Sequence, residues 1–144
     1  MNKGTIVITG GAGGLGTSCA HLLKEHKLVI TDHSTEVVDR AVAALKADGF
    51  DAVGHACDIT SAADVTKLKD FTKQQGPFKG MVHTGGVSGT VGDPKKVFAI
   101  NLVATAIIVE PKSVANNATQ PVGTGPYKLD RWNKGSSVTL TKWD

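Results

Sequence analysis

The segment that decides the fold is residues 5–16, which read TIVITGGAGGLG. Its first four residues form a short β-branched run, and such a run closed by glycines predicts a buried strand. The apolar positions that follow, from Gly14 to His26, fit a helix packed on a sheet. A glycine-rich loop between a strand and a helix lets backbone N–H groups approach a pyrophosphate at the positive end of the helix dipole.

The same alternation continues to about residue 108. Further strands are predicted at residues 28–31, 52–57 and 79–83, and further helices at 37–45, from Thr60 or Ser61 to 71, and from Pro94 to 107. Strands and helices that alternate in units of about 25–30 residues favour parallel pairing with right-handed crossovers. We therefore predict an α/β fold, a three-layer, doubly wound and mostly parallel sheet.

The pattern changes after Val109. Prolines gather there, and residues 127–132 and 136–143 read as two alternating strands joined by a three-residue turn with Gly135. We expect one domain over residues 1–144, made of a dinucleotide-binding segment at 1–108 and a loop plus antiparallel β-hairpin at 109–144. The hairpin is predicted to cover the sheet edge that the fourth strand leaves open.

The glycine loop carries a dinucleotide pattern with the required context. G-x-G-x-x-G is read from Gly11, Gly13 and Gly16, and Asp32 follows at the end of the second strand. A carboxylate there accepts the hydroxyls of the adenosine ribose and repels a 2′-phosphate. No Arg or Lys lies in the loop or at positions 33–34, so the sequence favours NAD over NADP. Two alternatives stay open, a strand–helix turn without ligand and a helix-capping role for Asp32.

Residues 1 to about 108 resemble the N-terminal part of a short-chain dehydrogenase/reductase with a Rossmann-like fold. The resemblance implies that Asp58 contacts the adenine, with Ile59 beside the ring. It also identifies Asn101 as the helix asparagine that organises the catalytic water and lysine of that family. The family motif Asn-Asn-Ala-Gly is replaced by residues 83–86, HTGG, which removes both strand-stabilising asparagines. The expected cofactor-binding residues are Gly10, Ala12, Gly13, Gly14, Leu15, Gly16, Asp32, Asp58, Ile59, Thr84, Gly85 and Gly86.

The catalytic pattern of that family has no match. The family needs a tyrosine with a lysine four residues later and an upstream serine, but the chain's single tyrosine, Tyr127, is followed by Arg131 and lies in a predicted strand. Arginine does not replace that lysine. We assign no catalytic residue and treat Asn101 as a polar helix residue.

The segment 109–144 resembles part of periplasmic oligopeptide-type solute-binding proteins, through residues 111–115 and the run PVGTGPYKL at 121–129. Two resemblances that meet near residue 108 suggest a chimera, with a truncated natural gene as the alternative. Three functions follow as hypotheses: a non-catalytic NAD-binding module of weak affinity, a scaffold without ligand, and a truncated NAD-dependent short-chain oxidoreductase.

The amino-acid composition and the spacing of a few residue types indicate the expected partners, location and metal content of the protein. Sixteen basic and 13 acidic residues give a net charge of +3 without a basic stripe, which argues against nucleic acid as a partner. No apolar stretch approaches membrane-spanning length and the first residues form no secretory signal. Cys19 and Cys57 fit a reducing compartment, so we expect a cytoplasmic protein. The five histidines show no metal spacing, and we predict no metal site. We expect a homodimer through the sheet edge or by hairpin exchange.

Overall fold

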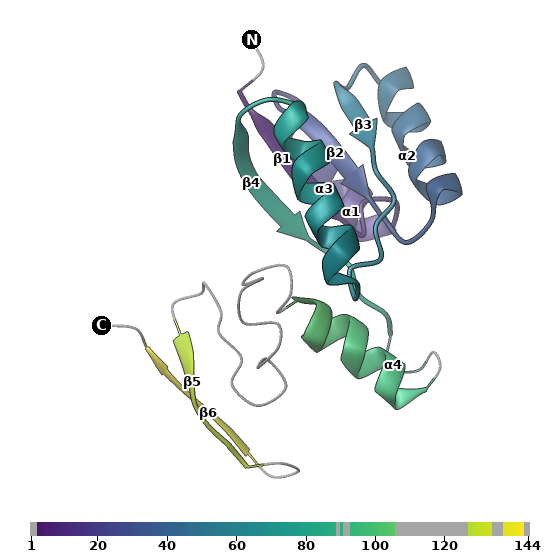
Figure 1. Ribbon diagram of the computed structural model, residues 1–144. Coiled ribbons are helices and arrows are strands. Elements are labelled where there is room, and N and C mark those ends of the chain that lie inside the picture. The colour runs from purple at the N-terminus through teal and green to yellow at the C-terminus, as the bar shows by residue number, and fades with distance from the viewer. Residues whose placement is uncertain (1–2, 89, 91–92, 106–126, 134–136, 143–144) are drawn as a thin grey trace.

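The fold is described by a computed structural model for residues 3–88, 90, 93–105, 127–133 and 137–142. A four-stranded parallel sheet of order β3-β2-β1-β4 forms its centre. Its elements follow in chain order as β1 (Thr5–Thr9), α1 (Gly14–His21), β2 (Lys27–Thr31), α2 (Thr35–Ala47), β3 (Ala52–Gly54), α3 (Ala62–Gln74) and β4 (Phe78–His83). The predicted doubly wound arrangement is confirmed for this part of the chain (Figure 1).

Helices cover both faces of the sheet, which makes three layers. On one face, Ile8 and Ile30 pack with Ala20 of α1 and Val38 of α2. The residues that point the other way form a second cluster, in which Val7, Val29 and Cys57 pack with Leu68 of α3. In Figure 1, α3 lies across the near face of the sheet and α1 lies behind it. All five residues of β1 are buried, because a central parallel strand faces apolar groups on both sides.

Local capping fixes where the helices begin and end. The Ser34 side chain accepts the Val37 N–H at the start of α2, and the Ser61 side chain accepts the Asp64 N–H at the start of α3. Ser61 therefore caps the third helix, and Thr60 does not. Gly49, with φ +81°, follows the end of α2 in the left-handed conformation.

Two predicted elements are shorter in the structure. The first helix ends at His21 and not at His26, because the N–H groups of Leu22, Leu23 and His26 bond to carbonyls three residues back and form tight turns. The third strand ends at Gly54 and not at Cys57. Beyond Gly54 the chain stays beside β2 only through isolated bonds, such as Cys57 N–H to the Asp32 carbonyl at 2.9 Å.

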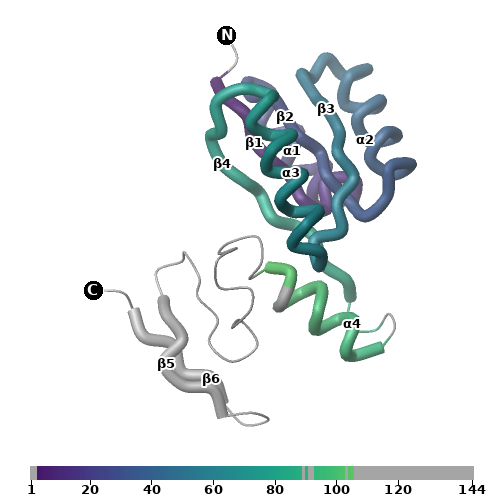
Figure 2. The backbone as a smooth tube through the Cα atoms, viewed as in Figure 1, coloured from purple at the N-terminus to yellow at the C-terminus, as the bar shows by residue number. Residues whose placement is uncertain are grey.

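The helix predicted from Pro94 to 107 changes type along its length. It begins as α4 (Pro94–Phe98), capped by the Asp93 side chain, and continues as a π-helix, η1 (Ala99–Val103). Figure 2 traces the chain from the carboxyl end of β4 into this segment. Residues 106 and 107 lie outside the described residues.

Beyond the parallel sheet the structure describes two further strands, β5 (Tyr127–Asn133) and β6 (Ser137–Lys142). They pair antiparallel from Tyr127↔Lys142 to Asn133↔Ser137 in a two-stranded sheet of their own. The turn with Gly135, and Trp143, lie outside the described residues. Coverage of the β4 edge by the hairpin stays a prediction.

Candidate functional site

One cleft lies where the four parallel strands end. The segments after β1, β2, β3 and β4 meet at the same edge of the sheet, as a parallel sheet requires, and line a cavity of about 950 Å³. This volume falls in the range typical of small-molecule sites. Of the expected cofactor-binding residues, the cleft is lined by Gly10, Ala12, Gly13, Asp32, Asp58, Ile59, Thr84, Gly85 and Gly86. Gly14, Leu15 and Gly16 are not among its lining residues.

The glycines of the loop serve two different purposes. A Cβ on Gly16 would lie 2.3 Å from the Gly10 carbonyl oxygen, and one on Gly10 would lie 2.7 Å from the Gly85 nitrogen. These two glycines let α1 and the segment after β4 approach the loop closely. A Cβ on Gly14 would meet no atom within 4 Å. Gly14 therefore leaves open space at the first turn of α1, where helix N–H groups point outward.

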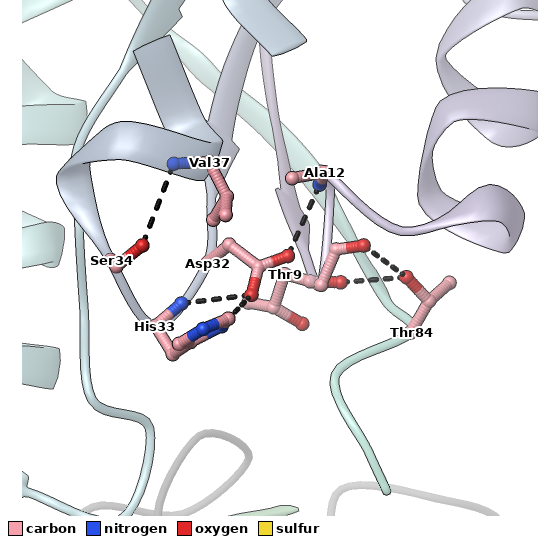
Figure 3. Close-up of polar contacts among 8 residues, drawn as sticks. Thr9, Ala12, Asp32, His33, Ser34, Val37 and Thr84 are labelled. Carbon is pink, nitrogen blue, oxygen red and sulfur yellow. Dashed lines mark hydrogen bonds and ion pairs between the residues drawn. The ribbon is translucent and has the colours of Figure 1, made fainter. Parts of the chain in front are cut away.

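Asp32 ties the end of β2 to the glycine loop. Its Oδ2 accepts the Ala12 N–H at 3.2 Å, and its Oδ1 accepts the His33 N–H at 2.8 Å, with His33 Nδ1 at 2.7 Å (Figure 3). The side chain keeps 17% of its surface exposed, on the cleft. The helix-capping alternative for Asp32 is wrong, because Ser34 caps α2.

Asp58 and Ile59 form the next wall. Asp58 Oδ1 accepts both the N–H and the hydroxyl of Thr60, at 2.8 and 2.6 Å. These two hydrogen bonds hold the pKa of the Asp58 carboxyl below its usual value, which keeps it ionised at neutral pH. Ile59 packs toward Gly85, since a Cβ on that glycine would lie 3.1 Å from Ile59 Cδ1.

Thr84 connects the segment after β4 to the end of β1. The sequence left this connection in question, because residues 83–86 lack both asparagines of the family motif. Its hydroxyl donates to the Thr9 carbonyl at 2.8 Å and lies 3.3 Å from the Gly10 carbonyl (Figure 3). Its N–H also donates to the Thr9 carbonyl, at 3.0 Å. The segment after β4 is thus fastened to the end of β1 without either asparagine.

Asn101 has a larger role than that of a polar helix residue. Its Oδ1 accepts the Val87 N–H and its Nδ2 donates to the Val87 carbonyl, both at 2.8 Å. Because this pair of bonds fixes the loop Gly85–Val87, Asn101 shapes the cleft from the π-helix η1. A π-helical turn is frequent at functional sites.

The lining residues that were not anticipated include His33, Arg40, Cys57 and Lys96. Arg40 is exposed on α2, eight residues after Asp32, and only the packing of α2 beside the loop brings it to the cleft. Burial, followed by the Asp64 and Asp58 charges, raises the pKa of the Cys57 thiol to about 11.

Two features are absent from the described residues. No cluster of three metal-ligating side chains occurs there. No helix in the same residues has the length and apolar character needed to span a membrane.

Fold and cleft together define an α/β protein of the Rossmann type. Solved structures with the same fold include an actinorhodin polyketide ketoreductase with NADPH, which has 21% identity and a TM-score of 0.66 over 81% of this chain and 49% of its own. A short-chain dehydrogenase/reductase from Burkholderia phymatum in complex with NAD has 26% identity and a TM-score of 0.62 over 74% and 42%.

The sequence comparisons identify the family. Residues 4–92 match the KR domain family. Zerumbone synthase from Zingiber zerumbet is 32% identical over 94% of this chain and 60% of its own length. The 2-(S)-hydroxypropyl-CoM dehydrogenase 3 of Xanthobacter autotrophicus is 31% identical over 73% and 45%. The chain therefore belongs to the KR domain family of short-chain dehydrogenase/reductase-like Rossmann proteins, and it spans about half the length of these relatives.

Proposed function

We propose that the cleft binds the adenosine half of NAD, and that the 144-residue chain does not itself transfer hydride by the tyrosine–lysine route. The observation that carries the proposal is the Asp32 carboxylate, which the Ala12 N–H holds at the mouth of the glycine loop with part of its surface open to the cleft. A carboxylate in this position has acceptor capacity left for ribose hydroxyls.

The residues fit a dinucleotide in three respects. The open space beside Gly14 leaves the first turn of α1 accessible to a pyrophosphate. Asp58 and Ile59 offer a polar edge and an apolar wall for an adenine ring. Gly85 and Gly86 line the cleft on the segment after β4, where the lack of a side chain lets the backbone approach a ligand closely. When bound, the nicotinamide group would supply the hydride chemistry.

The preference for NAD over NADP is part of the proposal. Asp32 would repel a 2′-phosphate, whereas Arg40 lines the same cleft and would attract one. Asp32 is mostly buried, while Arg40 is exposed and its charge is screened by solvent. We therefore expect the carboxylate to dominate.

The absence of hydride transfer rests on the sequence of the tail. Tyr127 and Arg131 lie in β5, so the tyrosine is on a strand and has no lysine four residues later. Because this chain spans about half of its curated relatives, reductase activity of a longer protein is a separate proposal.

The separate origin of residues 109–144 gains no support from the comparisons. The match to zerumbone synthase covers 94% of the chain and so extends past residue 108. Neither of the relatives named above is a solute-binding protein. A chimera and the solute-binding resemblance of the tail stay predictions.

Calorimetric titration with ADP-ribose tests the function, with NAD as the comparison. Since the assigned contacts lie in the adenosine half, we expect both ligands to bind with similar affinity, with a Kd on the order of tens of micromolar to millimolar. No binding of either ligand to a protein that melts cooperatively would show a scaffold without ligand. Oxidation of NADH with a carbonyl substrate would show a reductase.

Two expectations about the whole chain stay proposals, namely a cytoplasmic location and a homodimer through the sheet edge. Exposed apolar residues on β4 support the second, with Phe78 59% and Met81 40% exposed. Light scattering of the purified chain and of the double variant Phe78→Lys/Met81→Lys tests it. A monomeric wild-type protein would contradict the dimer.

A further inference from the structure

His83, the last residue of β4, has both of its ring nitrogens in hydrogen bonds beside the cleft. It is partly buried, and both of its ring nitrogens meet threonine hydroxyls. Nδ1 lies 2.5 Å from Thr9 Oγ1 at the end of β1, and Nε2 lies 2.9 Å from Thr105 Oγ1, beyond η1. Neither the dinucleotide contacts nor the tether made by Thr84 uses this group.

The hydrogen-bond pattern determines where the imidazole carries its proton. Thr105 Oγ1 also lies 3.0 Å from the Asn101 carbonyl oxygen, which can only accept, so the single hydroxyl proton of Thr105 goes there. Thr105 Oγ1 can then only accept from His83, and Nε2 must carry the proton. In the neutral ring Nδ1 is an acceptor, and the fully buried Thr9 hydroxyl donates to it.

This arrangement joins the two walls of the cleft. One end of the chain of bonds is Thr9, which immediately precedes the glycine loop. The other end is Asn101, whose side chain fixes Val87 through two bonds of 2.8 Å. His83 therefore connects the strand that leads into the loop, through Thr105, to the π-helix that fixes the segment after β4.

We propose that His83 is a positioning residue for dinucleotide binding. As the neutral Nε2–H form, it holds η1 and the loop at residues 85–87 in a fixed position relative to the glycine loop. The inference rests on the proposed function for its ligand, but the bridge itself exists in the free protein.

Protonation works against the bridge. A proton on Nδ1 would turn that atom into a donor toward Thr9 Oγ1, and the buried Thr9 hydroxyl would have to give up its acceptor. Burial lowers the pKa of His83 from 6.5, which agrees with a site built for the neutral ring. The titratable and charged groups on the surrounding elements include Lys79 on β4, Lys95 and Lys96 on α4, Asp93 before α4, Asp58 after β3, His21 on α1, and Asp64, Lys67, Lys69, Asp70 and Lys73 on α3.

The direction of the pH effect follows from this shift. Because the folded-state pKa is lowered, the neutral ring contributes stability at pH values above 6.5, and this contribution is lost as the pH falls through the folded pKa. We expect NAD to bind more weakly at pH values below the folded pKa of His83 than at pH 8, by about three- to tenfold, the range expected for one hydrogen bond.

The experiment has two independent readouts. Imidazole ¹⁵N spectra of the free protein report the protonated nitrogen of His83, and the Val87 amide chemical shift reports the loop. We expect the Nε2–H form at pH 8, a His83 pKa below 6.5, and a Val87 shift that moves in His83→Ala and returns in His83→Gln, whose Nε2 can donate to Thr105. Two results would overturn the proposal even if no NAD binds. One is an Nδ1–H form of His83, and the other is a Val87 amide chemical shift that is the same in the wild type and in both variants.

Calorimetry at pH 8 and pH 5 supplies the second readout. His83→Gln should keep most of the wild-type affinity for NAD at pH 8 and show a smaller pH dependence than the wild type, because His33 stays in the cleft. His83→Ala and Thr105→Val should each weaken binding about three- to tenfold, and the double variant no further. His26→Asn, remote from the cleft, should behave as wild type. A pH dependence in His83→Gln as large as in the wild type contradicts the proposal. Val87 shifts that respond to pH without any NAD binding would contradict only the proposed function.

Discussion

The Ala12 N–H donates a hydrogen bond of 3.2 Å to Asp32 Oδ2, across 20 residues of sequence. The parallel pairing of β1 with β2 makes this contact possible, because Thr9 and Thr31 are register partners and both chains leave the sheet at the same level. A second bond, from the Gly11 N–H to the Thr31 carbonyl at 3.0 Å, fixes the loop beside the end of β2. The loop and its acidic partner are therefore one preorganised unit.

Two glycines on the same helix are expected to respond oppositely to alanine. Gly16→Ala places a Cβ 2.3 Å from the Gly10 carbonyl, so we expect a loss of about 3 kcal/mol in the free energy of unfolding. Gly14→Ala meets no atom within 4 Å and should be neutral or stabilising by up to about 1 kcal/mol. Urea denaturation measures both, and equal stabilities of the two variants would show that the loop is not packed as described.

Loss of the Thr84 hydroxyl should loosen the connection between β4 and β1. Thr84→Val removes the bonds to the Thr9 and Gly10 carbonyls and should reduce the free energy of unfolding by about 1–2 kcal/mol. Thr84→Ser retains the hydroxyl and serves as the matched control. If the serine variant is as unstable as the valine variant, the methyl group and not the hydroxyl is responsible.

The two cysteines should differ in reactivity. Cys57 is 3% exposed and its thiol pKa is raised to about 11, so about one molecule in a thousand carries the thiolate at pH 8. Cys19 is partly exposed. We expect one fast thiol toward an aromatic disulfide reagent in the native protein and two after unfolding. Cys57→Ser should keep the fast phase and Cys19→Ser should lose it; fast reaction of Cys19→Ser would show that Cys57 is accessible.

The sheet and its order of elements were predictable because their signals are local. The β-branched runs of β1 and β2 are buried on both faces, and Gly49 ends α2 by its own conformation. The early end of α1 was not predictable, since Leu22 and Leu23 continue the apolar pattern although Leu22 is 86% exposed. Periodicity alone does not distinguish a helix from a series of tight turns.

The site was predictable in its glycines and Asp32, whose spacing follows from the strand–loop–helix geometry. Arg40 was not, because its place at the cleft depends on how α2 packs. The bonds that Asn101 and Thr84 make also required tertiary structure, since each joins segments distant in sequence. In each case the sequence shows the residue, but it does not show which distant segment that residue contacts in the fold.

Calorimetric titration with NAD and NADP of the wild-type chain, Asp32→Ala and Asp70→Ala tests the central claim most directly. Asp70 is an exposed residue of α3 paired with Lys73, so its removal changes the net charge equally without touching the cleft. We predict that the wild-type protein and Asp70→Ala bind NAD about tenfold more tightly than NADP, and that Asp32→Ala binds NAD several-fold more weakly and no longer discriminates. Unchanged NAD affinity in Asp32→Ala, or a wild-type preference for NADP, would contradict the assignment of Asp32 to the adenosine ribose.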